Sequence, residues 1–242
     1  MSTAWTWTNC WRRSMSSSAP KAPVLDARLA AAAAWVRPGG VAADIGCDHG
    51  KLAVYLAVTG VCRRVVAADL RPGPLARAAA LCERYGCAGR VDCRLGDGLA
   101  ALAPDEAQDI VIAGVSGVTA AEMLRCAPFP IRPGTRFIFV PPTKHGALRD
   151  YLWRGGFPLI GEQPVLAAGR VYTVLCAEYT GEKRVPSLFD CAVGLTPKTG
   201  AAARAYLAHT ALLAEKYARG AQEKETYLEL AAQVRAAAEE VR

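Results

Sequence analysis

Between residue 25 and about residue 180, short apolar runs of β type alternate with Ala-rich runs of helical type. Such an alternation is typical of a parallel sheet whose connecting helices cover both faces. The predicted strands are Val41–Ile45, Arg64–Leu70, Val91–Leu95, Asp109–Ala113 and Arg136–Val140. The predicted helices are Leu25–Val36, Lys51–Val58, Pro74–Tyr85, Thr119–Cys126 and Ala147–Arg154. The sequence therefore predicts an α/β fold.

The pattern changes after the fifth predicted strand. Two strand-like runs, Phe157–Ala167 and Arg170–Tyr179, are joined by Ala168-Gly169, which predicts a β-hairpin. A parallel series that ends in an antiparallel pair resembles the chain order of class I methyltransferases. Nicotinamide-binding domains lack that final pair, so the expected fold is a Rossmann-like methyltransferase sheet.

A second change of composition comes at Thr199, after which Ala, Glu, Lys and Leu dominate and no strand is predicted. Apolar and aromatic residues recur at helical spacing on both sides of Gly220: Tyr206, Thr210, Leu213 and Tyr217, then Tyr227, Leu230, Val234, Ala237 and Val241. This pattern predicts an antiparallel helical hairpin of coiled-coil type. The alternative is one helix packed on the core, followed by a frayed end. The expected division is a head of residues 1–22 without function, a Rossmann-like domain over 23–197 and the hairpin over 198–242.

Composition excludes several classes of protein. Charged residues break the apolar runs before they reach the ~18–20 residues of a membrane span. Residues 1–21 lack the apolar core and cleavage site of a signal peptide, which favours a cytoplasmic protein. The nine cysteines are scattered with no C-x-x-C pair, as expected for buried thiols in a reducing compartment, and the three histidines add no ligand spacing. We therefore expect no metal site and no membrane partner.

The net charge of +7 is concentrated outside the predicted hairpin, because residues 1–197 carry +6 of it. Most of the basic residues there are arginines, whose guanidinium group suits bidentate phosphate contacts. A charge of this size is permissive of nucleic-acid binding without requiring it.

The first predicted strand leads into a glycine-containing turn that starts a helix, V-A-A-D-I-G-C-D-H-G from Val41 to Gly50. Gly46 lets the backbone approach a ligand closely, and the following helix N-terminus favours a carboxylate. Asp44, at the end of the strand, is placed to engage an ammonium group, whereas a pyrophosphate site disfavours a carboxylate there. Together with Cys47, these residues predict an S-adenosylmethionine site.

Two further carboxylates fall at the ends of the next two predicted strands. Asp69 closes the second strand, where nucleotide-binding sheets place the carboxylate that accepts from ribose hydroxyls. Asp97, beside Gly98, follows the third strand, where it is placed to accept from the amino group of adenine. Each alone is also consistent with a turn or cap residue. Their occurrence at successive strand ends favours a shared ligand site.

The stretch L-D-A-R-L…A-D-I-G-C-D-H-G-K-L…G-D-G-L…I-V-I-A-G resembles the bacterial tRNA adenine-22 N1-methyltransferase family, also called TrmK. The resemblance covers about residues 25 to 242, including the helical hairpin. It rests most specifically on D-I-G-x-D-H, from Asp44 to His49, and on I-A-G, from Ile112 to Gly114. It implies methylation of an adenine N1 in tRNA, with S-adenosylmethionine as cofactor and tRNA as partner; a monomer or weak dimer is expected.

The resemblance and the chemistry together give candidate roles to the remaining site residues. Asp48 replaces a glycine of ordinary methyltransferases and is the candidate for stabilising the positive charge of the methylated base, with a helix N-cap as the alternative. His49 is expected to hold Asp48 or to contact RNA, unless it is a satisfied half-buried imidazole. The carbonyls at Ala113 and Gly114 are candidates to accept from the adenine amino group. Arg28 is expected to pair with the cofactor carboxylate, or else to be a surface arginine.

The chain departs from the family pattern on the substrate side. It has Val115-Ser116 where family members read M-G, Val140-Pro141-Pro142 where they read Q-P-N, and Lys51 where a Tyr is common. These departures leave two alternatives open. One is a cofactor-binding paralogue with an altered target or lost activity, and the other is a small-molecule methyltransferase.

Overall fold

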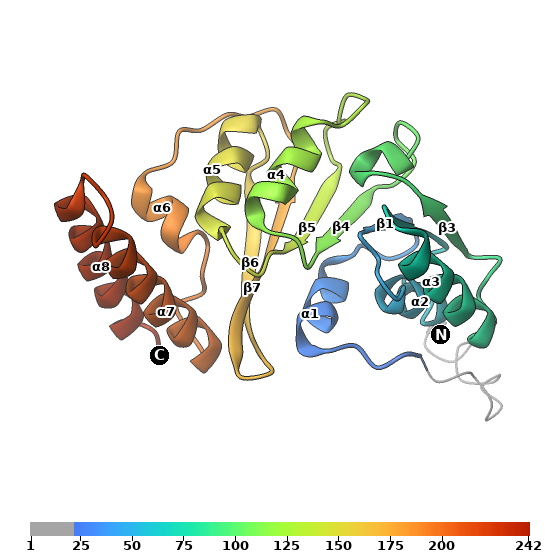
Figure 1. Cartoon of the computed structure of the whole chain (residues 1–242), viewed down its shortest axis with the longest axis horizontal. Coiled ribbons are helices and arrows are strands. Elements are labelled where there is room, and N and C mark those ends of the chain that lie inside the picture. Colours follow the sequence, from blue (N-terminus) through green and yellow to red (C-terminus); the bar gives the residue numbers. More distant parts are fainter. Residues whose placement is uncertain (1–21) are drawn as a thin grey trace, which may run out of the picture.

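A computed structural model describes residues 22–242, so the expected head lies outside the described residues except for residue 22. Seven strands form one sheet in the order β3-β2-β1-β4-β5-β7-β6 (Figure 1). The strands are β1 Val41–Ile45, β2 Arg64–Asp69, β3 Val91–Leu95, β4 Asp109–Ala113, β5 Arg136–Val140, β6 Leu159–Ala167 and β7 Arg170–Glu178. β1 to β5 are parallel, and β7 runs antiparallel to both β5 and β6. The predicted parallel sheet with a terminal antiparallel hairpin is confirmed.

Helices cover both faces of this sheet, because successive strand residues point to opposite sides. Ala42 of β1 packs in one apolar cluster with α1, α2 and α3, while the adjacent Ala43 packs in another with α4, α5 and the 3-10 helix η2. These elements are α1 Ala27–Trp35, α2 Lys51–Val58, α3 Pro72–Arg84, η2 Gly98–Ala101, α4 Gly117–Arg125 and α5 His145–Gly155. The strand order reverses at β1 and β4, which is where open sheets of this kind bind their ligands.

The C-terminal residues form the predicted helical hairpin, α7 Ala201–Ala218 and α8 Lys224–Glu239, at one end of the molecule (Figure 1). Both helices contribute to a shared buried cluster that includes Tyr206 of α7 and Val234 of α8, so the alternative of a frayed end is wrong. A further short helix, α6 Leu188–Val193, was not predicted; a capping box between Ser187 and Asp190 stabilises its start. It lies between α5 and the hairpin.

A buried ion pair connects the hairpin to the sheet. Arg149 of α5 is completely buried and donates to both carboxylate oxygens of Glu162 in β6, at 2.8 and 2.6 Å. The same guanidinium donates to the Tyr206 hydroxyl of α7 at 2.8 Å and to the carbonyls of Cys191 and Ala192 in α6. Because four elements share one cation, the hairpin is fixed against the sheet rather than loosely tethered.

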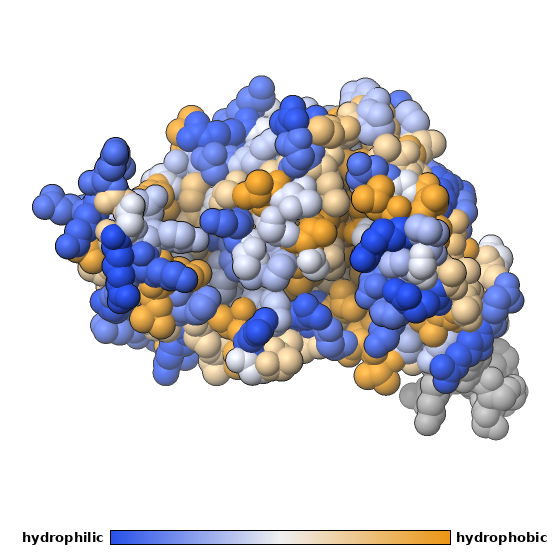
Figure 2. Space-filling model, viewed as in Figure 1, coloured by the Kyte–Doolittle hydropathy of each residue, from blue (hydrophilic) through white to orange (hydrophobic). Residues whose placement is uncertain are grey.

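The hydropathy of the surface differs between the hairpin and the middle of the molecule. On the face shown in Figure 2, hydrophilic side chains cover the outside of the hairpin at the left, whereas hydrophobic side chains gather around a hollow near the middle.

Within residues 22–242, no helix has the length and hydropathy that crossing a membrane requires. The same residues contain no group of three or more His, Cys, Asp or Glu side chains arranged to hold a metal ion.

Candidate functional site

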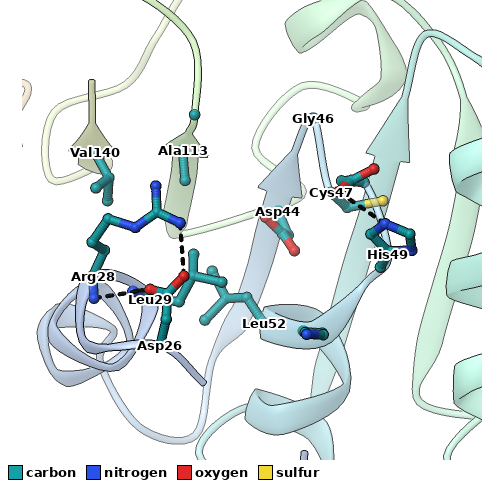
Figure 3. A pocket seen from close by; sticks show the side chains of 13 residues that line it. Asp26, Arg28, Leu29, Asp44, Gly46, Cys47, His49, Leu52, Ala113 and Val140 are labelled. Atoms are coloured by element: carbon teal, nitrogen blue, oxygen red, sulfur yellow. Dashed lines mark hydrogen bonds and ion pairs between the residues drawn. The ribbon is translucent and has the colours of Figure 1, made fainter. Parts of the chain in front are cut away.

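A cavity of about 250 Å³ opens at the carboxyl ends of β1 and β4, where the strand order reverses. Most of the predicted site residues line it, namely Arg28, Asp44, Gly46, Cys47, Asp48, His49, Ala113 and Gly114. Figure 3 shows Asp44 below the turn at Gly46, with Arg28 reaching from α1 towards Ala113 and Val140 on one side and His49 on the other. Three further predicted residues lie at or after the carboxyl ends of β2 and β3, outside this cavity: Asp69, Asp97 and Gly98.

The loop between β1 and α2 owes its shape to left-handed backbone conformations. Gly46 and Gly50 have φ values of 74° and 67°, and Asp48 has a φ of 49°. A side chain at Gly50 would place its Cβ 2.7 Å from the Cβ of Ala78 in α3. Glycine is therefore required at Gly50 both by its backbone angle and by the close approach of α3.

Asp44 lies at the floor of the cavity and is only 4% exposed. Asp44 is the penultimate residue of β1, which ends at Ile45 as predicted, so its carboxyl group lies one residue before the end of the strand. Burial is the main cause that raises the pKa of Asp44 to about 7, and the charge of Asp69 adds to it. A cationic ligand group at this point would favour the ionised carboxylate.

Asp48, His49 and Arg77 form one polar network at the cavity wall. Arg77 of α3 donates its Nε–H to Nδ1 of His49 at 3.0 Å, which leaves the imidazole proton on Nε2. That nitrogen is 3.3 Å from a carboxylate oxygen of Asp48, whose other oxygen is 3.7 Å from Arg77. Asp48 does not cap α2, because the N-cap residue is Gly50. The cap interpretation of Asp48 is therefore wrong, and Arg77 is a site residue that the sequence did not indicate.

The imidazole of His49 is neither deeply buried nor unpartnered. It exposes 51% of its side chain, and both ring nitrogens have partners. This geometry fits the expectation that His49 holds Asp48, and it also fits a satisfied imidazole with no further role.

Asp69 closes β2, as predicted, and is 6% exposed. Its carboxylate accepts from the backbone N–H of Asp48 at 3.2 Å and from that of Arg71 at 2.9 Å. The bond to Arg71, two residues along the chain, is the kind expected of a turn residue, whereas the bond to Asp48 fixes the loop between β1 and α2. Asp69 thus has a structural task in addition to any contact with a ligand.

Asp97 is exposed after β3 and makes no side-chain hydrogen bond with η2, so its carboxylate does not cap that helix. Gly98, next to it, has a φ of 53°, and a Cβ at this position would lie 3.3 Å from the side chain of Met123. Asp97 is therefore accessible to a ligand, whereas Gly98 is partly covered by Met123.

Arg28 occupies the rim of the cavity, 32% exposed, and is already paired. Its guanidinium donates to Asp26 at 2.7 Å and lies 4.8 Å from the ring centre of Tyr172. Asp26 also caps α1 by accepting from the backbone of Arg28 and Leu29. Asp26 lines the cavity without having been predicted, and an anionic ligand would compete with it for Arg28.

Comparison with known proteins also indicates a methyltransferase domain. The family model described as "Methyltransferase domain" matches residues 25–175. The tRNA (adenine(22)-N(1))-methyltransferase of Bacillus subtilis is 31% identical over 154 residues, which cover 64% of this chain and 65% of that protein. The sequence-based resemblance to that enzyme family is therefore supported by alignment, over somewhat less than two thirds of the relative's length.

Two solved structures share the fold over nearly the whole chain. The crystal structure of the B. subtilis tRNA methyltransferase TrmK has a TM-score of 0.76 at 24% identity, covering 90% of this chain and 98% of that one. The Streptococcus pneumoniae protein Sp1610, in complex with S-adenosyl-L-methionine, has a TM-score of 0.73 at 23% identity, covering 89% and 100%. Both likenesses include the helical hairpin, since the coverage extends well beyond the sheet. From the family match over residues 25–175, the chain belongs to the methyltransferase domain family.

Proposed function

We propose that this protein transfers a methyl group from S-adenosylmethionine to N1 of an adenine in tRNA, at position 22 by similarity to its B. subtilis relative. The observation that carries the proposal is the cavity at the reversal of the strand order. It combines the buried carboxyl of Asp44 with the Asp48–His49 pair on one side and the backbone of Ala113 and Gly114 on the other.

The residues present fit S-adenosylmethionine. Asp44 offers a buried carboxylate to the ammonium group of the methionine part, and the N-terminus of α2, at Lys51 and Leu52, faces the same cavity. Asp69 and Asp97 follow along the sheet edge, at the positions proposed for the ribose and adenine contacts. When bound, the cofactor supplies a methyl group on a cationic sulfonium.

The protein's own part in such a transfer is alignment and charge stabilisation rather than strong base catalysis. N1 of adenine is a neutral nucleophile, so its lone pair needs only to be aligned with the methyl carbon and the sulfur. The adenine must first leave its stack to enter the cavity. Carbonyl oxygens at Ala113 and Gly114 are proposed to accept from its amino group.

Asp48 is the proposed stabiliser of the reaction. The base acquires positive charge as its N1–C bond forms, and an adjacent carboxylate lowers the energy of that charge. His49 donates from Nε2 towards Asp48, and Arg77 fixes the imidazole from the other side, so the carboxylate is held in place before the substrate binds. We therefore propose that Asp48, His49 and Arg77 act together to stabilise the positive charge of the methylated base.

Two of the departures from the family pattern, Ser116 and Pro141, make local structural contacts. Ser116 caps α4 by accepting from the backbone N–H of Thr119 at 3.1 Å. Pro141 is buried, and its carbonyl lies 3.0 Å from Nε2 of His145. Val140 lines the cavity beside Ala113. Because Ser116 and Pro141 have structural partners of their own, these two departures do not by themselves argue for lost activity.

One assay tests the proposal against its alternatives. The purified protein is incubated with labelled S-adenosylmethionine and an unmodified tRNA transcript, and reverse transcription is then used to find a stop at the modified adenine. A transcript with guanine at position 22 is the control and should give neither label nor stop. Tight cofactor binding without labelled RNA would contradict the proposal and favour a paralogue with another target, or a small-molecule enzyme.

A further inference from the structure

A second cavity, of about 420 Å³, lies between the start of α5, α6 and the two helices of the hairpin. Its walls are mainly apolar and include Tyr217, Tyr227, Leu213 and Leu188. Tyr217 is 47% exposed and Leu188 44% exposed, so this surface is open to solvent. An apolar groove of this size, bordered by a few polar groups, is typical of a binding site.

The aromatic side chains give the groove its chemical character. The rings of Tyr217 in α7 and Tyr227 in α8 lie 6.1 Å apart and are inclined by 51°, close to the loop that joins the two helices of the hairpin. Tyr206 lies deeper, and its hydroxyl accepts a hydrogen bond from Arg149. Exposed aromatic faces bind unpaired nucleobases by stacking, irrespective of sequence.

A positive charge stands directly beside these rings. The ammonium of Lys144, which lines the groove, lies 5.5 Å from the ring centre of Tyr217. Asp150, the carboxylate that lines the groove, is neutralised by Arg154 at 2.7 Å. An aromatic face next to an ammonium matches a nucleotide, whose base stacks while its phosphate pairs with the cation.

His145 adds a hydrogen-bond acceptor to the groove. Burial is the main cause that lowers its pKa to about 4, so the imidazole is neutral at physiological pH. Its Nε2 is bonded to the carbonyl of Pro141 at 3.0 Å and therefore carries the proton. Nδ1 remains as an acceptor on a residue that lines the groove, suited to an exocyclic amino group.

The groove is adjacent to the proposed active site along the chain. Val140 lines the first cavity and Lys144 the second, with only the turn of residues 141–143 between them. Four residue steps span at most about 14 Å. A few nucleotides of a single-stranded segment can cover that distance, so one RNA strand can reach both cavities.

We propose that this groove holds an unpaired base of the RNA substrate, close in sequence to the methylated adenine, with its ring against Tyr217 and Tyr227 and its phosphate on Lys144. This inference rests on the proposed function. It adds a second nucleotide subsite, built by the hairpin and the β5–α5 turn together. The hairpin would then contribute to recognition through a defined base contact as well as through its shape.

The test compares Tyr217→Ala and Lys144→Gln with the intact protein, measuring KM for the tRNA transcript, kcat and the Kd for S-adenosylmethionine. Loss of one stacking face should raise KM for tRNA at least about five-fold, with the cofactor Kd unchanged. Tyr217→Phe, which keeps the ring, should bind RNA far better than Tyr217→Ala. Leu212→Ala, exposed on α7 but outside the groove, is the matched control and should keep the original KM.

The outcomes separate the two proposals. If the intact protein methylates tRNA and Tyr217→Ala does so with unchanged KM, the subsite is disproved while the proposed function stands. If the intact protein methylates no tRNA, the proposed function is disproved. RNA affinity of the intact protein and of the same variants is then measured directly, and a lower affinity of Tyr217→Ala would still support RNA binding in the groove. A change of oligomeric state in Tyr217→Ala, without a change in RNA affinity, would show that the groove holds a second copy of the chain instead.

Discussion

The Nε–H of Arg77 in α3 donates to Nδ1 of His49 across 3.0 Å, although the two residues are 28 positions apart in the sequence. This bond selects the imidazole tautomer whose Nε2–H faces Asp48. A proton added at Nδ1 would break the bond and set two cations against each other. The orientation of Asp48 is therefore coupled to a residue of α3 that does not line the cavity.

The first prediction concerns Asp48 itself. Asp48→Ala should lower kcat for tRNA methylation at least ~100-fold while the Kd for S-adenosylmethionine stays roughly constant, because the carboxylate acts on charge that develops only during transfer. Single-turnover kinetics and calorimetric cofactor binding measure the two quantities. Turnover that survives the substitution would leave Asp48 with no catalytic role.

A second prediction follows from the contact between Arg77 and His49. Arg77→Gln and His49→Ala should each lower kcat by about ten-fold, and the double variant should be little worse than either, since both residues act on the same carboxylate. Arg84→Gln, a change on the same helix outside this network, is the control. Losses that multiply in the double variant would show that Arg77 and His49 act independently.

Asp44 gives a prediction about pH. Its pKa of about 7 in the free protein means that the carboxyl is increasingly protonated as the pH falls below that value, whereas a ligand α-amino group remains protonated. Affinity for S-adenosylmethionine should therefore fall by up to about ten-fold per pH unit below pH ~7. Asp44→Asn should bind weakly at every pH and lose this slope. A wild-type affinity that does not change with pH in that range would contradict the assigned role.

The sequence predicted the strands that position the site better than the side-chain contacts within it. β1, β3, β4 and β5 begin and end at the predicted residues, because their apolar runs are short and bounded by turn residues. The six-residue helix α6 was missed, since a single turn and a half gives little periodicity to detect. Arg77 was missed for a different reason: its partner is set by the packing of α3 beside the loop between β1 and α2, which no local pattern records.

The close approach of α3 to the loop leads to a prediction for Gly50. Gly50→Ala should destabilise the protein and weaken cofactor binding, because the new Cβ would lie 2.7 Å from the Cβ of Ala78 in addition to the cost of a positive φ. Gly60→Ala is the matched control, since Gly60 has a φ of 74° with no neighbouring atom within 4 Å of a Cβ. It should cost about 1–2 kcal/mol and leave cofactor affinity unchanged. Equal effects on cofactor affinity would contradict the steric argument.

The buried pair of Arg149 and Glu162 allows a sharper test of what fixes the hairpin. Arg149→Met leaves the Glu162 carboxylate buried without its cation, and should lower the free energy of unfolding by about 3–5 kcal/mol. Adding Glu162→Gln removes the stranded charge, so the double variant should be more stable than Arg149→Met alone. Arg154→Met breaks the exposed pair with Asp150 one turn further along α5 and should cost less than about 1 kcal/mol. Urea unfolding monitored by circular dichroism gives all three values. An Arg149→Met variant as stable as Arg154→Met would mean that apolar packing around Tyr206, and not the shared guanidinium, holds the hairpin against the sheet.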